Sequence, residues 1–337
     1  MRAVTLTSTP PELALAEVAD PVPAPDGVVL AVTACGICGS DLHVAGVIGA
    51  PGTILGHEIA GVVEAVGPEV GDRWRPGQAV AVRPTTGCGT CAECTRGRPD
   101  HCRATALLGL DRPGGFAEHV AVAARDLFAL PTALSGPEQA LVEPLAVARR
   151  ALRRADLQPG EAVSVIGAGP VGLAVIAWAR ALGAGVVVAS DPSASRRQLA
   201  LDLGADAVVD PGDGDLGAAT VAAAGAPSSV VVECSGRPEQ IGRAMDHCGV
   251  DGRVVVLGVC LAEVAIVPWI GLAKELDVRF SLYYEPRDFT DTIGALEDDR
   301  LVARAMLTET IGLAELPDRF ARLRHEPHGG KVVVLPA

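Results

Sequence analysis

Four cysteines lie within fifteen residues of this chain, in the pattern C-x2-C-x2-C-x7-C. Cys-x2-Cys steps have the spacing of zinc ligands, and four thiolates fill the tetrahedral shell of a zinc ion. No coordination position then remains for water or a substrate, so this metal would only hold its loop together. A tight cluster in a reducing cytosol indicates a metal before disulfides. A nucleic-acid-binding zinc ribbon is the competing use. The cluster consists of Cys88, Cys91, Cys94 and Cys102.

A zinc ion that does chemistry needs an open coordination position and ligands from separate segments. Two upstream segments offer such ligands, Cys35-Gly-Ile-Cys-Gly-Ser-Asp-Leu-His43 and Gly56-His-Glu58. Taken singly, Cys38 would more often be a small buried hydrophobic residue, and His57 a hydrogen-bonded loop histidine. Their clustering with Asp41, His43 and Glu58 favours a second metal site.

A glycine pattern downstream, Gly167-Ala-Gly-Pro-Val-Gly172, has the spacing G-x-G-x-x-G. Alone it is weak evidence. However, an apolar strand-like run precedes it, an Ala-rich run that predicts a helix from about Pro170 to Leu182 follows, and Asp191 ends the next apolar run nineteen residues after the last glycine. That arrangement is typical of a dinucleotide-binding turn, in which Gly167 permits the turn, Gly169 admits a pyrophosphate and Gly172 allows close helix packing. The alternative is an ordinary strand-turn-helix without a ligand.

The cofactor expected at this turn is NAD rather than NADP. Asp191 can accept hydrogen bonds from the hydroxyls of an adenine ribose, and the same carboxylate would repel a 2′-phosphate. Arg196 and Arg197 weaken this preference, because either side chain could meet a phosphate. Further cofactor contacts are expected from the glycine turn, from the helix after Asp191 and from the end of a later strand, namely Val171, Arg196, Leu257 and Val259.

The residue patterns around these motifs predict the elements that position them. Residues 1–142 contain short β-type runs broken by Gly and Pro, which predicts a β-rich, largely antiparallel domain with the cysteine lobe at about 85–105. From 143 to 279, apolar strands alternate with Ala-rich helices, which predicts a parallel, doubly wound sheet. Residues 280–337 are expected to pack back on the first domain. The predicted fold class is therefore α/β.

Composition narrows the class of protein further. The chain has 337 residues, 49% of them hydrophobic, and a net charge of −13 at pH 7. Such an acidic chain is a poor candidate for binding nucleic acid or an anionic membrane. No apolar run reaches the roughly 18 residues of a membrane span, and the first eight residues resemble a strand more than a signal peptide. These features favour a cytoplasmic enzyme or binding protein with a small-molecule ligand.

Taken together, the motifs resemble those of the zinc-dependent medium-chain alcohol dehydrogenases, and within them the polyol, sorbitol and threonine dehydrogenase branch. The matching motifs, in the family's order, are C-G-I-C-G-S-D-L-H, G-H-E, the cysteine lobe, V-E-P-L-A at 142–146, G-A-G-P-V-G and K-E-L at 274–276. The resemblance implies a GroES-like catalytic domain interrupted by a Rossmann domain. It also implies one catalytic and one structural zinc, NAD, and a homodimer or homotetramer.

The family's site residues can be carried over by position. The resemblance implies that Cys38 and His57 bind the catalytic zinc. The remaining protein ligand is Glu58 or Glu143, and the sequence leaves this choice open. Glu143 could instead be a salt-bridged acid at a helix start. Asp41 resembles the carboxylate that orients the zinc-binding histidine, a role that makes chemical sense.

Ser40 and His43 resemble the family's proton relay, which runs from the substrate through the serine and the cofactor ribose to the histidine. Ser40 could otherwise simply cap a helix. The chain departs from the family at Gly39, where some members carry an arginine for the cofactor phosphates, and at Phe280, where relatives usually have Gly.

The expected function is the reversible oxidation of a secondary alcohol to a ketone, with zinc as a Lewis acid and NAD as the hydride acceptor. The glutamate in V-E-P-L-A, Glu143, favours a polyol, sugar, cyclitol or amino alcohol as the substrate, by resemblance only. One alternative is a sensor protein that binds zinc and NAD without turnover. Another is an NADP-dependent or zinc-free reductase of the same superfamily.

Overall fold

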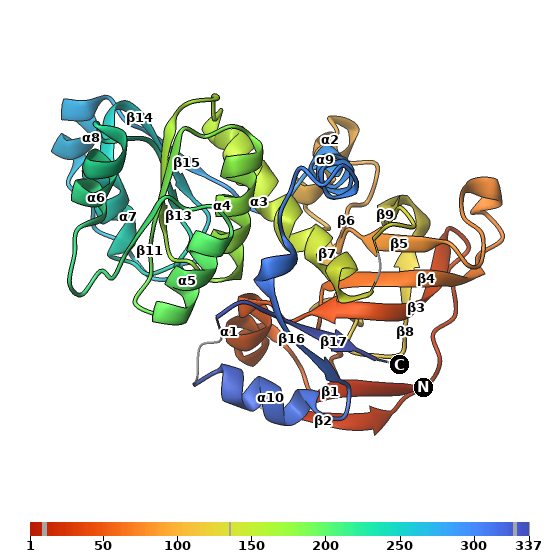
Figure 1. Ribbon diagram of the computed structural model, residues 1–337. Helices are drawn as coiled ribbons and strands as arrows, with labels where there is room; N and C mark the ends of the chain where they lie inside the picture. The colour runs from red at the N-terminus through yellow and green to blue at the C-terminus, as the bar shows by residue number, and fades with distance from the viewer. Residues whose placement is uncertain (9–11, 135, 326–328, 337) are drawn as a thin grey trace. The chain divides into compact units, whose positions relative to one another are not determined.

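The computed structural model describes residues 1–8, 12–134, 136–325 and 329–336. It divides into two compact units (Figure 1). Unit 1 is assembled from three segments of the chain, 1–143, 285–297 and 307–337. Unit 2 is assembled from two, 144–284 and 298–306.

This division differs from the expected boundaries at the C-terminal side. Residues 280–284 and 298–306 belong to unit 2, although the sequence patterns assigned them to the first domain. Residue 143 belongs to unit 1. The chain therefore passes between the units more often than a change in apolar periodicity can indicate, because periodicity reports the type of element and not the core that buries it.

Unit 1 is built around a seven-stranded sheet. Its strands are β3 (Gly27–Gly36), β4 (Glu58–Val66), β5 (Ala79–Val82), β8 (His119–Ala123), β9 (Leu127–Ala129), β16 (Leu307–Gly312) and β17 (Lys331–Leu335). Their order is β16-β17-β3-β4-β5-β9, and β8 also pairs with β3. The pairs are antiparallel except β16–β17, which is parallel. Strand β3 is rich in Val and largely buried, as expected for a central strand.

Two small antiparallel sheets complete the strands of unit 1. They pair β1 (Arg2–Ser8) with β2 (Glu12–Glu17), and β6 (Thr85–Thr86) with β7 (Ala106–Leu107). The helices and 3-10 turns are α1 (Gly39–Ile48), η1 (Gly71–Arg73), α2 (Ala92–Thr95), η2 (Pro99–His101), η3 (Ala124–Asp126), η4 (Gly136–Leu141), α9 (Pro286–Glu297) and α10 (Leu316–Leu323). Helix α3 (Val142–Ala155) begins in unit 1 and continues in unit 2.

Unit 2 contains a six-stranded sheet in the order β12-β11-β10-β13-β14-β15, with parallel pairs throughout. The strands are β10 (Ala162–Ile166), β11 (Val186–Ser190), β12 (Ala207–Val209), β13 (Ser228–Glu233), β14 (Cys248–Val256) and β15 (Asp277–Phe280). The helices between them are α4 (Pro170–Ala181), α5 (Ala194–Asp202), α6 (Leu216–Ala224), α7 (Gln240–His247) and α8 (Pro268–Lys274), and the turn η5 (Arg304–Met306) follows later.

The strand order reverses direction between β10 and β13, as in a doubly wound sheet whose ligands bind at that switch point. The predicted α/β class is thus confirmed, with one β-rich unit and one Rossmann-type unit. The helix expected from about 170 to 182 is α4, which begins at Pro170, between the second and third glycines of the pattern. None of the helices in the described part of the chain has the length and apolar character needed to span a lipid bilayer.

Candidate functional site

Three side chains with metal-binding atoms gather at one end of the sheet in unit 1. Cys38 follows β3, and His57 and Glu58 lie at the start of β4. One ligand atom from each lies within 4.8 Å of the other two. The antiparallel register, which pairs Gly36 with Glu58, brings the end of β3 and the start of β4 together. Two motifs separated in the sequence therefore form one cluster.

Asp41, in the first turn of α1, fixes two members of this cluster from behind. Its Oδ1 lies 3.3 Å from His57 Nδ1, and its Oδ2 accepts a hydrogen bond from the Cys38 backbone N–H at 2.9 Å. The carboxylate is only 2% exposed. A proton on Nδ1 that is donated to Asp41 leaves His57 Nε2 as the nitrogen able to coordinate a metal.

Electrostatics at the cluster favour cations. Burial would lower the pKa of His57, but the nearby carboxylate of Asp41 and the sulfur of Cys38 raise that pKa well above its ordinary value. A metal ion would therefore replace a proton on His57. Such a donor set, with one thiol, one imidazole and one carboxylate, suits zinc.

The carboxylate of Glu58 contacts a buried lysine. Its Oε1 accepts a hydrogen bond from Lys331 Nζ at 2.5 Å, and its Oε2 is buried without a hydrogen-bond partner. Burial would lower the pKa of Lys331, but the charges of Glu58, Cys38 and Glu143 raise it. Glu143 itself is buried in the first turn of α3. It does not belong to the group of described ligand atoms within 4.8 Å of one another.

Sequence reasoning missed Lys331, although its signal is visible. A lysine that opens the otherwise apolar run Lys331-Val-Val-Val-Leu335 must either lie at the surface or meet a buried acid. The structure shows that it meets Glu58.

Ser40 and His43 lie one turn apart on α1. Ser40 Oγ is 3.4 Å from His57 Nε2, which is the nitrogen that faces the cluster. His43 is exposed to solvent. Positions three residues apart share one face of a helix, so the pair extends from the buried cluster to the surface. Helix α1 begins at Gly39, one residue before Ser40.

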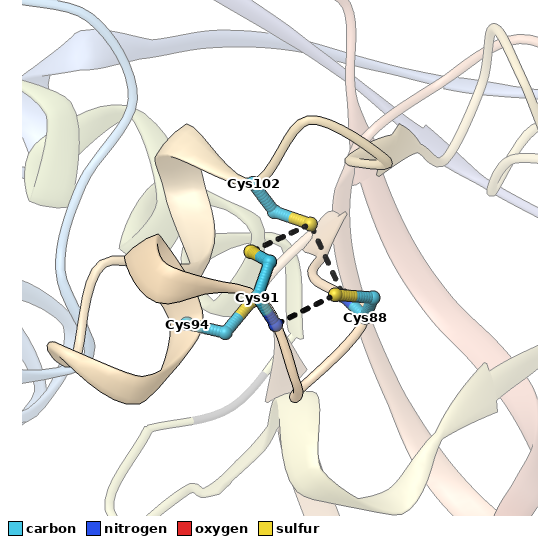
Figure 2. A group of neighbouring side chains, drawn as sticks. All are labelled: Cys88, Cys91, Cys94 and Cys102. Atoms are coloured by element: carbon cyan, nitrogen blue, oxygen red, sulfur yellow. Dashed lines mark hydrogen bonds between the residues drawn. The ribbon is translucent and has the colours of Figure 1, made fainter.

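The four clustered cysteines form a second group in unit 1 (Figure 2). Their sulfur atoms all lie within 4.8 Å of one another. The Cys91 and Cys102 sulfurs are 3.7 Å apart, close to the roughly 3.8 Å that a tetrahedral zinc with Zn–S bonds of about 2.3 Å requires. All nine cysteines of the chain are free of disulfides. This spacing fits a four-thiolate metal site.

Backbone and side-chain donors surround these sulfurs. Cys91 N–H donates to Cys88 Sγ and Cys88 N–H donates to Cys102 Sγ, each at 3.3 Å. A hydrogen bond from the Thr90 hydroxyl, with help from backbone N–H groups, lowers the pKa of Cys88 to about 6. Donors that stabilise a thiolate also stabilise a metal-bound sulfur, so the lobe is suited to hold a cation.

In unit 2, the glycine pattern forms the turn between β10 and α4. Gly167 has a φ of +90°, which favours glycine. A Cβ on Gly172 would lie 1.9 Å from the Gly167 carbonyl oxygen, so the helix packs on the turn only because this residue has no side chain. Gly169 precedes α4, and Val171 is half-buried in its first turn. The exposed backbone N–H groups of such a helix start suit a phosphate.

Asp191 follows β11 beside this turn. Its Oδ2 accepts from the Ala168 backbone N–H at 2.9 Å, and its Oδ1 accepts from the Ser193 N–H at 2.8 Å. The Arg196 guanidinium lies 3.6 Å from Oδ2. Arg197 instead donates to the carbonyl oxygen of Asp191 and to the carboxylate of Asp210. Arg196 therefore faces the carboxylate of Asp191, whereas Arg197 donates its hydrogen bonds to acceptors away from that carboxylate.

Glu233 ends β13, and the segment 233–236 that it opens is, from its place at the end of a strand, a further candidate near the cofactor. Its Oε1 accepts hydrogen bonds from the Ser235 N–H, the Ser235 hydroxyl and the Gly236 N–H at 2.6, 2.5 and 2.9 Å. The side chain thereby shapes the loop after β13, which packs on Gly167. After β14, Leu257 is buried, whereas Val259 is 61% exposed.

Two metal-compatible clusters in a β-rich unit and a dinucleotide-type turn in a Rossmann unit define a two-domain zinc-binding dehydrogenase. A family model described as the alcohol dehydrogenase GroES-like domain matches residues 24–132, and one described as zinc-binding dehydrogenase matches residues 170–298. The chain belongs to the zinc-dependent medium-chain alcohol dehydrogenase family.

Individual relatives are similar over most of their length. The chain is 35% identical to 2-dehydro-3-deoxy-L-galactonate 5-dehydrogenase of Pseudoalteromonas atlantica, over 89% of this chain and 88% of the relative. It is 30% identical to sorbitol dehydrogenase of Bacillus subtilis, over 92% and 90%. A zinc-binding dehydrogenase from Sinorhizobium meliloti, solved bound to NADP, superposes with a TM-score of 0.90 at 33% identity and covers 99% of both chains.

Proposed function

We propose that the protein oxidises a secondary alcohol of a polyol, sugar, sugar acid, cyclitol or amino alcohol to a ketone, reversibly, with zinc and NAD. The observation that carries this proposal is the cluster of Cys38, His57 and Glu58. Three protein ligands on a tetrahedral zinc leave one position for a substrate oxygen, which is the arrangement of a catalytic site. The relatives that act on a sugar acid and on sorbitol support the substrate class.

Each residue of the cluster has a role in this proposal. Zinc held by Cys38, His57 and Glu58 would supply Lewis acidity that favours release of the substrate hydroxyl proton. Asp41 orients the His57 ring through Nδ1. The Ser40 hydroxyl lies 3.4 Å from His57 Nε2 and would accept that proton while passing its own onward.

His43, exposed on the same face of α1, would pass the proton to solvent. Imidazole is the side-chain group that most readily gains and loses a proton at neutral pH, which suits that task. Glu143 remains a candidate for temporary coordination, because it is buried and close enough to Lys331 to raise the pKa of that lysine.

The four thiols of the cysteine lobe would hold a second, structural zinc. That ion leaves no open position, so it would stabilise the loop and take no part in hydride transfer. The sulfur separation of 3.7 Å and the N–H donors around the thiols support this assignment.

For the cofactor we propose NAD. The glycine turn would hold the pyrophosphate, with Val171, Leu257 and Val259 as further contacts. A carboxylate oxygen accepts more than one hydrogen bond, so the bonds that Asp191 already makes leave capacity for a ribose hydroxyl. Its negative charge disfavours a 2′-phosphate. Arg196, at 3.6 Å, partly offsets that charge, and the NADP-bound relative makes the comparison of both cofactors essential.

We further propose a homodimer or homotetramer assembled through unit 2. Strand β15 is an edge strand, and Phe280 on it is 65% exposed. Trp269 and Leu272 on the neighbouring α8 are each 71% exposed. Exposed apolar side chains beside an unpaired strand edge are typical of a subunit contact.

The free cysteines suit the reducing conditions of the cytoplasm, which is the compartment that we propose for this protein.

The function is tested by following reduction of NAD and of NADP with a panel of polyols, sugars, sugar acids, cyclitols and amino alcohols. We expect turnover with NAD for at least one class. Cys38→Ser and His57→Ala should abolish turnover while fluorescence titration still detects NAD binding. Cys260→Ser is the matched control, since this half-buried thiol lies in unit 2 and donates a hydrogen bond to the Ala262 carbonyl oxygen. Near-normal turnover in either metal-site variant would refute the assignment.

A further inference from the structure

The buried pair of Glu58 and Lys331 is more than a structural contact. The two side chains come from strands that start 273 residues apart, and each is 1% exposed. Removing two charges from water is costly, and replacing a buried ion pair by apolar residues is often neutral or stabilising. A buried ion pair beside a group of metal ligands is therefore more simply explained by a role at the metal site than by a contribution to stability.

The contact is one-sided. Lys331 Nζ donates to Glu58 Oε1 at 2.5 Å and to the Ile37 carbonyl oxygen at 3.1 Å. Glu58 Oε2 is buried and has no hydrogen-bond partner. An unpaired buried carboxylate oxygen is expensive, so this atom is expected to meet a cation when the site is filled.

The sheet leaves room for this oxygen. Gly36 lies opposite Glu58 in the β3–β4 ladder, and a Cβ at Gly36 would lie only 1.9 Å from Glu58 Oε2. Strand β17 pairs with β3 on the other side, where Val333 lies opposite Gly36, and this places Lys331 at the same end of the sheet. Three neighbouring strands thus determine the orientation of one carboxylate.

Charge balance gives the lysine a second role. The Cys38 thiolate, Glu58 and Asp41 would place three negative charges in a space with little solvent. A divalent cation and Lys331 offset these three charges but not that of the nearby buried Glu143, so the filled site would be more anionic without Lys331. A net negative charge in a buried site weakens the binding of anionic ligands. It also reduces the ability of the metal to attract electrons from a substrate oxygen.

We propose that Lys331 is a positioning residue that holds Glu58 Oε1, so that Glu58 offers only Oε2 to the metal as a single-oxygen ligand. A carboxylate held in this way cannot occupy two coordination positions, which keeps one position open for the substrate. This inference rests on the proposed function of the cluster. It adds Lys331, the first residue of β17, to the residues that act at that cluster.

The test measures metal binding and not turnover. The variants are Lys331→Met, Lys331→Arg, Glu58→Gln and the double variant Glu58→Gln/Lys331→Met. Zinc affinity is measured by competition with a chromophoric chelator. With the lobe filled by zinc, Co²⁺ is then added and its visible absorption reports the coordination of the cluster.

We expect Lys331→Met to lower the affinity of the cluster at least tenfold and to alter the cobalt spectrum. Lys331→Arg keeps the charge and should stay within threefold of wild type. In the Glu58→Gln background, the lysine substitution should change affinity by less than twofold, because its partner is already neutral. Wild-type affinity and spectrum in Lys331→Met, or an equal loss in both backgrounds, would overturn the proposal.

Two further outcomes are assigned in advance. If Lys331→Met does not fold, Lys331→Arg and the charge-free double variant replace it. The proposal then expects the wild-type spectrum in the first and weakened binding in the second, and wild-type affinity in the double variant overturns it. Since no substrate or cofactor is added, a wild-type protein that oxidises no alcohol would refute the proposed function and leave this result unaffected.

Discussion

Replacing Asp41 by asparagine tests how the proposed metal-binding histidine is oriented. The two carboxylate oxygens of Asp41 lie 3.3 Å from His57 Nδ1 and 2.9 Å from the Cys38 backbone nitrogen. Asparagine has nearly the same shape, but one of its terminal groups is a donor. One of the two contacts must therefore place a donor against a donor, or change the tautomer of His57.

Both orientations of the new amide weaken metal binding. If the amide oxygen stays on the Cys38 N–H, the NH2 group faces His57 Nδ1 and favours the tautomer with its proton on Nε2, the nitrogen needed by the metal. If the amide is flipped, the buried Cys38 N–H loses its acceptor, which costs about 1–3 kcal/mol. The expected loss of zinc affinity is about 10- to 100-fold, as for other groups that orient metal-binding histidines.

The assay is a competition titration of the purified protein with a zinc chelator, in which the metal of the cysteine lobe is counted separately. Asp72→Asn is the matched control, because the Asp72 side chain is 98% exposed and forms an ion pair with the likewise exposed Arg75 on the surface. Zinc affinity of Asp41→Asn within twofold of wild type would refute the tautomer argument. Loss of zinc from the lobe as well would indicate a general folding defect and would equally refute it.

Four other substitutions test the remaining parts of the site. Gly172→Ala places a Cβ 1.9 Å from the Gly167 carbonyl oxygen, so we expect at least tenfold weaker NAD binding by calorimetry and a free energy of unfolding lower by about 1–3 kcal/mol. Gly242→Ala in α7, where a Cβ meets nothing within 4 Å, should bind NAD normally, and equal affinities in the two variants would contradict the packing argument. Glu233→Gln weakens the three hydrogen bonds to the loop after β13 and should lower the free energy of unfolding, measured in urea, by about 1–3 kcal/mol. Glu239→Gln is the control, because Glu239 is exposed, and it should leave this free energy unchanged. Equal free energies of unfolding in the two variants would contradict the role given to Glu233. Cys94→Ser should remove one zinc per chain by metal analysis and lower the melting temperature, while turnover survives at moderate temperature; full zinc content would count against the structural site. Phe280→Lys at the edge of unit 2 should shift the mass measured by light scattering toward the monomer, and an unchanged mass would exclude β15 as the contact.

Local patterns in the sequence predicted the elements of unit 2 and the chemistry of two motifs. The predicted helix from about 170 to 182 differs from α4 by one residue, because apolar periodicity, a proline in the first turn and a preceding glycine are all local signals. The four cysteines of the lobe lie within fifteen residues, so their proximity follows from the covalent chain. The glycine turn is predictable for the same reason.

Other contacts depend on which strands pair and in what register. The sequence left Glu58 and Glu143 as equal candidates for the metal, and only the β3–β4 ladder places Glu58 in the group with Cys38 and His57. The limits of the compact units near residues 280–306 differ from the expected ones for a similar reason, since short segments alternate between two cores there.

The sequence alone therefore determined which chemical groups this protein has and which of them must be neighbours along the chain. It determined the thiols of the lobe, the glycines of the turn and the alternation of strands and helices. The tertiary structure alone decided that Lys331 meets Glu58 and that Gly36 leaves space for its second oxygen. Such contacts join residues hundreds of positions apart, and strand pairing is set by the packing of the whole core rather than by any local pattern.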